Sequence, residues 1–268
     1  MRYHYTYDDL VGAFTKLRFF DQHEAVFISG DLGKLGLGDF GNREQSLVSL
    51  LNALIDVFGD STTIMTSTFT HDLVNTDKVF DKEKTLSMHG AVANFFINHP
   101  KSVRSSHPFT SFCAIGPKAE YLCGEDLIHP YGIDSPYDKF LSLQNPLTIS
   151  LGLPPNITCS LVHHAEVVMN VPYRYIKEFS HKVIQNGVEL EKNYCLPVVY
   201  REVEATRNKN VRIFDIFKEL NQVKEADVGR GKIYCYQSNE LFKSMIAQFK
   251  NNIYCWFDSP PKNRPYRK

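Results

Sequence analysis

LTISLGLPPNITCSLVHHAEVV, residues 147–168, joins an apolar run to a segment that carries two reactive side chains. The apolar run ends at Gly152, and a short apolar run bounded by Gly and Pro predicts a buried strand. A helix is expected directly after Ser160, whose hydroxyl is suited to accept a hydrogen bond from an unsatisfied backbone amide. On that helix His163 and Glu166 are three residues apart, which places them on one face.

This pairing of side chains is typical of a catalytic base. A carboxylate beside an imidazole fixes the tautomer of the ring and keeps it basic. Open α/β sheets place their binding crevices at the carboxyl ends of strands, where this helix begins. We therefore predict that His163 is a general base held by Glu166. The alternative for the same pair is an ordinary ion pair on a helix surface.

Strand-like and helix-like patterns alternate through the first two-thirds of the chain. Helices are expected at residues 7–18, 43–59 and 88–98, and strands at residues 25–30, 62–70 and 112–116. This alternation predicts an α/β fold, a layered α/β/α arrangement around a central sheet that is mostly parallel or mixed.

The last third of the chain has a different pattern. Asn186-Gly187 stands between two alternating runs, which is the strongest short signal of a β-hairpin. Residues 232–250 predict a strand followed by a helix, and the Pro-rich, basic tail 259–268 predicts a frayed end. We expect one domain, residues 1–268, with a soft division into 1–175 and 176–268.

Composition excludes several classes of function. Thirty basic and thirty acidic residues cancel, so no overall field favours nucleic acid or an anionic membrane as a partner. The N-terminus lacks the apolar core of a signal peptide, and no apolar stretch is long enough to span a bilayer, so a cytoplasmic location is expected. None of the six cysteines forms a Cys-x-x-Cys pair, so no metal site is expected.

Three further motifs each allow two interpretations. The glycine run 30–41 does not have the dinucleotide-binding spacing and is either a loop near a ligand or a plain surface loop. The segment 104–112, RSSHPFTSF, is either an anion-binding loop or a turn whose hydroxyls satisfy their own backbone. Cys159 is near enough to His163 in sequence to keep a covalent mechanism open, although no G-x-S-x-G elbow is present.

Five segments together resemble the aminoglycoside 3-N-acetyltransferase family. In chain order they are FDKEKTLSMHGAVANFF, VRSSHPFTSFCAIGP, DSPYDKFLSL, LTISLGL and SLVHHAEVVMNVPY, which lie within residues 60–175. The resemblance implies transfer of an acyl group from acetyl-CoA, or from another acyl-CoA, to an amine on a sugar ring without a metal ion.

The resemblance also implies roles for individual residues. His163 would be the general base and Glu166 its orienting partner. Asp72, beside His71, would lie near the substrate amine, and Glu202 would be a second carboxylate on the substrate side. Contacts with the coenzyme would come from polar residues of three segments: Ser29, Asp31, Arg104, Ser105, His107, Ser111 and Ser160. The chain has Ser29-Gly30-Asp31 where the family often has His-Ser-Ser.

The charge balance suggests which amine is acylated. Enzymes that bind polycationic aminoglycosides need an acidic cleft, and this chain has no acidic excess. We therefore expect an amino sugar, nucleotide-linked, of surface-polysaccharide synthesis. The alternatives are an aminoglycoside acetyltransferase that confers antibiotic resistance and a non-catalytic protein that binds sugar nucleotides. A homodimer is left open.

Overall fold

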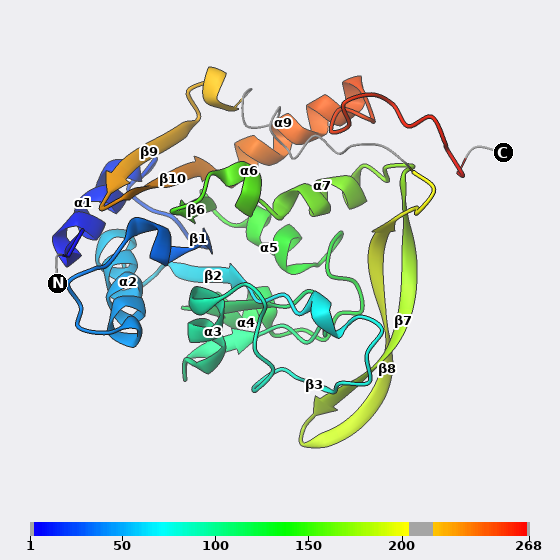
Figure 1. The fold of residues 1–268 in the computed structure, drawn as a ribbon, viewed down its shortest axis with the longest axis horizontal. Coiled ribbons are helices and arrows are strands. Elements are labelled where there is room, and N and C mark those ends of the chain that lie inside the picture. The colour runs from blue at the N-terminus through cyan, green and yellow to red at the C-terminus, as the bar shows by residue number, and fades with distance from the viewer. Residues whose placement is uncertain (1–2, 204–216, 267–268) are drawn as a thin grey trace.

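The computed structural model describes residues 3–203 and 217–266, and their main element is a seven-stranded sheet (Figure 1). In spatial order its strands are β4 (Ser102–Arg104), β5 (Phe112–Ile115), β2 (Thr63–Ser67), β1 (Ala25–Gly30), β6 (Leu147–Leu151), β10 (Gly231–Gln237) and β9 (Val223–Val228). β1 pairs in parallel with β2 and with β6, and the outer strands add in antiparallel orientation. The sheet is therefore mixed, as expected for this α/β fold.

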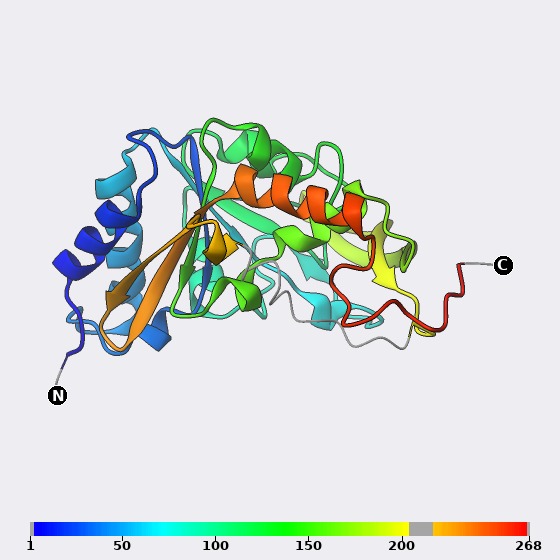
Figure 2. The same cartoon turned by 90° about the horizontal axis from the view of Figure 1, so that it is seen from above.

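Helices cover both faces of the sheet, which confirms the layered α/β/α arrangement. One face carries α1 (Tyr7–Leu17), α2 (Arg43–Phe58) and α3 (Ala91–Asn98); the other carries α4 (Ala119–Cys123), α5 (Pro136–Ser142), α7 (Leu161–Val168) and α9 (Ser238–Asn251). Figure 2 shows α1 and α2 on the opposite side of the sheet from α9. Side chains of β1 alternate accordingly, with Val26 and Ile28 in the first core and Ala25 and Phe27 in the second.

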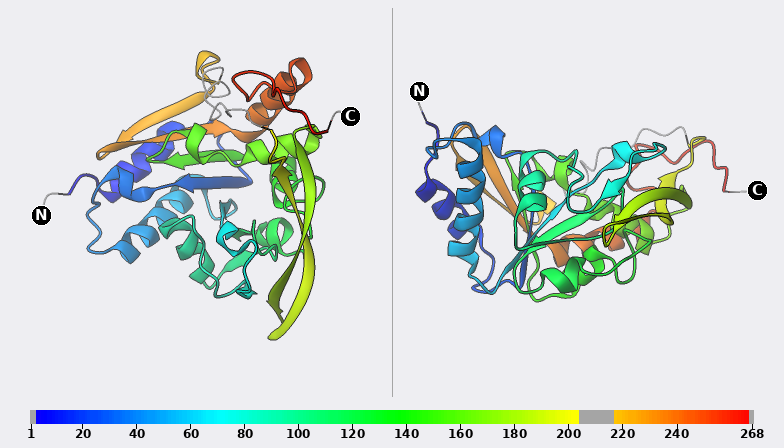
Figure 3. Two further views of the ribbon diagram at one scale, coloured as in Figure 1. Left: turned by 45° about the vertical axis from the view of Figure 1, so that its right-hand side comes forward. Right: turned by 90° about the horizontal axis from the view of Figure 1, so that it is seen from below.

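A second, three-stranded sheet lies beside the main body. It consists of β3 (Phe80–Asp81), β7 (Arg174–Gln185) and β8 (Val188–Val199). Asn186 and Gly187 form the turn between β7 and β8 with positive φ angles of 53° and 76°, which confirms the hairpin. The hairpin extends away from the large sheet (Figure 3), and a small apolar cluster that includes Phe80, Phe109 and Tyr194 packs it against the loop between β4 and β5.

Several local features differ from expectation. Three short helical segments precede or follow sheet strands where loops were expected: η1 (Leu32–Leu35), η2 (His71–Leu73) and α6 (Pro155–Thr158). The tail is not frayed in its described part, because the Arg264 guanidinium lies 5.0 Å from the Tyr254 ring and the Tyr266 hydroxyl donates to that of Tyr254. Among the described helices, none combines the length and apolarity needed to cross a bilayer.

Candidate active site

A large cavity lies at the carboxyl ends of the parallel strands. Ser29 and Gly30 end β1, Thr66 and Ser67 end β2, and Leu153 follows β6, and all of these residues line the cavity. Because β1 lies between β2 and β6, this is the point where open α/β sheets place their ligands. Its volume of about 1350 Å³ exceeds the roughly 300–1,000 Å³ of common ligand pockets, which leaves room for two substrates.

The His163–Glu166 pair lies at the wall of this cavity. The two residues share one face of α7, and Nδ1 of His163 is 3.1 Å from Oε2 of Glu166. The His163 side chain is 31% exposed and lines the cavity, whereas that of Glu166 is 0% exposed. When Nδ1 donates its proton to Glu166, Nε2 is the ring nitrogen that holds the lone pair. The pair therefore has the geometry of an oriented general base.

Two residues that the sequence analysis did not single out complete this cluster. Nε of Arg174 lies 2.8 Å from Oε2 of Glu166, and the hydroxyl of Tyr173 donates to Oε1 at 3.1 Å. The Arg174 side chain is 12% exposed, so a largely buried cation lies against the charge of Glu166. The sequence signal was a Tyr-Arg pair that follows the helix after four intervening residues, and nothing distinguished it from the start of a strand.

Two more imidazoles line the cavity, and both are close to the Phe69 ring. His71 and His89 lie 5.2 and 4.7 Å from that ring, and Nδ1 of His89 is 2.8 Å from the hydroxyl of Ser67. His71 is open to the cavity, but the walls remove much of its hydration and lower its pKa to about 4. Burial lowers the pKa of His89 as well. His71 is therefore uncharged at neutral pH.

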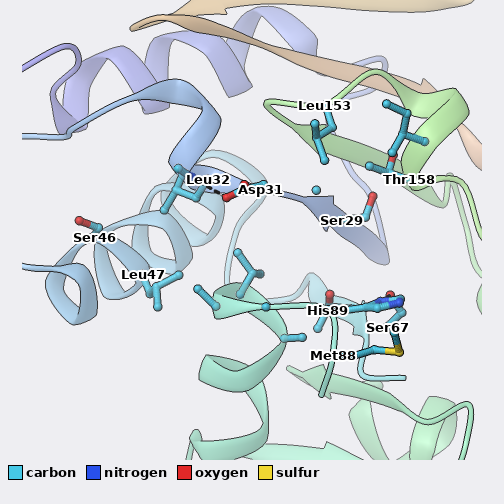
Figure 4. A pocket seen from close by; sticks show the side chains of 18 of the residues that line it. Ser29, Asp31, Leu32, Ser46, Leu47, Ser67, Met88, His89, Leu153 and Thr158 are labelled. Carbon is cyan, nitrogen blue, oxygen red and sulfur yellow. Dashed lines mark hydrogen bonds between the residues drawn. The ribbon is translucent and has the colours of Figure 1, made fainter. Parts of the chain in front are cut away.

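Three of the expected coenzyme contacts line the cavity: Ser29, Asp31 and Ser160. The hydroxyl of Ser29 is buried without a hydrogen-bond partner in the described part of the chain. In Figure 4 the Ser29 side chain lies on the same side of the cavity as Thr158, across from Ser67 and His89. Asp31 accepts a hydrogen bond from the Gly33 amide at 2.9 Å and caps η1.

Ser160 stands where α7 begins, but its hydroxyl does not cap the helix. Its φ and ψ angles of −82° and −9° are already helical, so the side chain does not turn back to the first amides as a cap in extended backbone does. The hydroxyl instead lies 2.5 Å from that of Tyr137 on α5. The prediction of a capping hydroxyl was therefore wrong, although the start of the helix was right.

Arg104 and Ser111 lie outside the cavity lining. Arg104 is 7% exposed, and its guanidinium donates to the carbonyl oxygens of Thr85 and Thr68 at 2.6 and 3.2 Å and to the Ser111 hydroxyl at 3.1 Å. Ser111 in turn donates to the Thr68 carbonyl at 2.9 Å. Because these donors are satisfied within the protein, the structure gives no support to the expectation that they contact the coenzyme.

The same correction holds for His107 and Ser105, which also lie outside the cavity lining. His107 accepts a hydrogen bond from the Thr110 amide at Nδ1, its Nε2 lies 3.2 Å from the Cys195 carbonyl oxygen, and burial lowers its pKa to about 3. The Ser105 hydroxyl accepts a hydrogen bond from the Phe112 amide. The described polar groups of segment 104–112 are thus bonded within the protein, partly to the segment's own backbone and partly to other segments, which is nearer to the second of the two interpretations.

The two expected substrate carboxylates are separate from the cavity lining. Asp72 is exposed in η2 beside His71, which does line the cavity. Glu202 is exposed in the turn that follows β8. The structure brings His71 and His163 to one cavity but does not bring Asp72 and Glu202 there.

Cys159 lines the cavity close to α7, but it is a poor nucleophile in this setting. Burial raises the pKa of its thiol to about 11, so the reactive thiolate is scarce at neutral pH. Within residues 3–203 and 217–266, no three His, Cys, Asp or Glu side chains are arranged to hold a metal ion.

Comparison with known proteins assigns the family. Residues 35–250 match the sequence profile described as aminoglycoside 3-N-acetyltransferase. The chain belongs to the aminoglycoside 3-N-acetyltransferase family. Among curated members, aminoglycoside N(3)-acetyltransferase IX of Micromonospora chalcea is 31% identical over 35% of this chain and 34% of its own. Aminoglycoside N(3)-acetyltransferase III of a Salmonella species is 37% identical over 57% and 55%. The chain thus spans about a third to just over half of the length of these two relatives.

Several solved structures share the fold. AAC-IIIb in a binary complex with CoASH has a TM-score of 0.78 and 18% sequence identity, over 95% of this chain and 98% of the other. YokD from Bacillus subtilis has a TM-score of 0.75 and 19% identity, over 94% and 96%. At these identities the likeness concerns the fold alone.

Proposed function

We propose that this protein is an acyl-CoA-dependent N-acyltransferase that acetylates an amine of an aminoglycoside. The main support is the buried Glu166 that orients His163 at the wall of a cavity large enough for two substrates. Family membership and the named relatives support the acyl transfer and the acceptor class.

The proposed reaction follows from what an amine needs in order to attack a thioester. A sugar amine is protonated at neutral pH, so His163 first removes a proton at Nε2. The amine nitrogen then bonds to the thioester carbonyl carbon, the C–S bond breaks, and the thiolate leaves. The imidazolium gives its proton to the sulfur, and the amide nitrogen releases its remaining extra proton to solvent, so the products are the amide, the free thiol and one proton. Proton transfer of this kind contributes typically about 10²–10⁴-fold in rate.

The walls around the glycine-rich segment fit a coenzyme that carries phosphates. The turn Ser29–Asp31 supplies a buried hydroxyl with no partner in the described residues. Asn42, Arg43 and Ser46, in and next to the first turn of α2, line the same cavity. A helix N-terminus with a guanidinium attracts phosphate groups. The coenzyme supplies the activated acyl group, and we place it along this wall.

A second acceptor class is favoured by the charge of the cavity. In the described lining, Asp31 is the one carboxylate, and it is matched by one guanidinium, that of Arg43. His71 is uncharged at neutral pH. A polycation gains little from such walls, whereas an amino sugar with one amine, carried by a nucleotide, does not need an acidic cleft.

The test is mass spectrometry of the products formed from a panel of acceptors and donors. Aminoglycosides and nucleotide-linked amino sugars are each incubated with acetyl-CoA and with longer acyl-CoAs. We expect an N-acetylated product with wild-type protein and with His99→Ala, a surface control, and almost none with His163→Ala. Normal turnover by His163→Ala would overturn the assignment of the base.

The same experiment decides between the remaining alternatives. Binding of amino sugars without acyl transfer to any of them would favour a sugar-nucleotide-binding protein. Product from the nucleotide-linked sugars alone would replace the aminoglycoside as acceptor. We further propose a cytoplasmic location, residues 1–175 as the catalytic and coenzyme side, and residues 176–268 as the substrate side. A homodimer stays a prediction that size-exclusion chromatography with light scattering can test.

A further inference from the structure

Arg174 connects the catalytic helix to the β7–β8 hairpin. Its guanidinium contacts three groups at once: Nε lies 2.8 Å from Oε2 of Glu166, Nη2 lies 3.4 Å from Nδ1 of His163, and Nη1 donates to the Pro197 carbonyl at 2.8 Å. Its side chain is only 12% exposed. As the first residue of β7, it is fixed by pairing with Val199 of β8. Figure 1 shows that β7 begins beside α7.

We infer that Arg174 is a positioning residue that keeps Glu166 an anion and His163 an unprotonated base at neutral pH. The inference rests on the proposed function for the role of His163. It concerns the protonation state of the pair, which the fold alone does not determine.

The argument concerns a cation that lies directly against the pair. With Arg174 present, the guanidinium 2.8 Å from Glu166 stabilises the carboxylate anion and disfavours a further positive charge on His163. Without Arg174 both effects are lost, so uptake of a proton by the pair is more favourable than in the wild type. The proton is then held more tightly, whichever of the two side chains carries it. Loss of Arg174 therefore keeps the base protonated to higher pH.

The other contacts that Tyr173 and Tyr131 make with the cluster carry no charge. Tyr173 donates one neutral hydrogen bond to Glu166, and the Tyr131 ring lies 5.9 Å from that of His163. The hydroxyl of Tyr131 is neutral, because burial raises its pKa far above the physiological range. The titratable groups around the cluster in the described residues are His71 from η2, Tyr131 from the loop before α5, Tyr173 before β7 and Cys255 after α9.

The experiment compares pH profiles of kcat/KM, which report the ionisation of the free enzyme. For Arg174→Ala we expect the acidic limb of the profile, where kcat/KM falls as the base becomes protonated, to lie about one pH unit higher than in the wild type. Added guanidinium ion at millimolar concentration should move this limb back toward its wild-type position. Arg174→Lys should move it in the same direction by less, because an ammonium cannot make the contacts of a planar fork. An unshifted limb in both variants would overturn the inference.

Two control variants separate charge from packing and from hydrogen bonding. Tyr173→Phe removes a hydrogen bond to Glu166 without removing a charge, so its profile should keep the wild-type limb. Arg18→Ala removes a guanidinium that also donates to a backbone carbonyl, that of Val57, but at the opposite end of the molecule. Its profile should match the wild type. A limb that moves equally in Tyr173→Phe would assign the effect to the loss of a hydrogen bond to Glu166 instead of to the loss of a charge.

A readout independent of turnover keeps this inference distinct from the proposed function. The His163 imidazole is followed by NMR through a pH titration of wild-type protein and of Arg174→Ala. If wild-type protein acylates no acceptor, the proposed function fails, and the titration still decides whether Arg174 controls the pair. A titration midpoint that rises in Arg174→Ala supports the inference, and an unchanged or lower midpoint contradicts it.

Discussion

The hydroxyl oxygens of Tyr137 and Ser160 lie 2.5 Å apart, between α5 and the start of α7. Tyr137 is 2% exposed, and its ring packs edge-on against Phe112 of the central sheet. Ser160 is three residues before His163. The contact therefore ties the position of the catalytic helix to the core of the sheet.

Tyr137→Phe and Ser160→Ala should each lower the free energy of unfolding by about 1 kcal/mol. Each substitution removes one of the two hydroxyl groups and leaves the other without this hydrogen-bond partner. In a double-mutant cycle measured by urea unfolding, we expect a coupling of about 1 kcal/mol. Tyr121→Phe is the matched control, since Tyr121 makes a similar contact with Ser142 at the surface. Simple additivity of the two buried substitutions would show that the contact does not stabilise the protein.

Gly30→Ala should strongly destabilise the floor of the cavity. Gly30 has a φ of 103°, and a Cβ there would lie 2.3 Å from the Leu151 carbonyl oxygen, so both the backbone and β6 would have to shift. We expect a loss of at least about 2 kcal/mol. Gly12→Ala, within α1 and with nothing within 4 Å of its Cβ, should instead stabilise by about 0.5–1 kcal/mol. Thermal unfolding of both variants measures the two changes in stability. Equal changes in Gly30→Ala and Gly12→Ala would contradict the prediction.

Cys159→Ala should retain most of the acyl-transfer activity. The thiol, with its pKa raised to about 11, is almost fully protonated at pH 7.5 and is not needed by a direct transfer. Alkylation of wild-type protein by iodoacetamide should also be slow at this position, as peptide mass spectrometry can show. Loss of activity in Cys159→Ala together with a trapped acyl-enzyme would instead establish a covalent mechanism.

Stability should fall as the pH drops below about 6.5. Burial lowers the pKa of His107 to about 3 and that of His164 to about 4, so between pH 6.5 and these values the unfolded chain binds more protons than the folded one. The stabilisation is complete above pH 6.5, and at pH 5 each residue should have lost about 2 kcal/mol.

The measurement is urea unfolding at pH 5 and at pH 8. His107→Gln removes one titrating group, so the difference between the two pH values should shrink by about 2 kcal/mol relative to wild type. The comparison uses only that difference, because the substitution itself changes stability at both pH values. An unchanged difference would mean that His107 is protonated in the folded state.

The elements with strong periodicity could be predicted from the sequence, and so could the placement of His163 beside Glu166. The strand at β1, the helix at α2 and the Asn186-Gly187 hairpin follow from apolar spacing and turn chemistry, which are local. His163 and Glu166 were placed on one face for the same reason. Spacing within one helix is set by its geometry, whatever the rest of the chain does.

The remainder of the site depends on contacts between distant segments. Arg174 reaches Glu166 because the chain reverses after α7, and His89 reaches Ser67 across more than twenty residues. The polar loop that contains Arg104 resembled a ligand site in composition, yet its donors are used by backbone carbonyls from other segments. Composition does not distinguish a polar group that awaits a ligand from one that the fold satisfies.

The β7–β8 hairpin is long enough that its turn lies far from the end that contacts the His163–Glu166 pair. From Arg174 to its turn, β7 runs for 12 residues, about 40 Å along the strand. One end takes part in the electrostatics of the base, while at the other end a Cβ at Gly187 would meet no atom within 4 Å. The turn is therefore a natural attachment point: a short affinity peptide inserted there, or a fluorophore, would report on the molecule without reaching its chemistry.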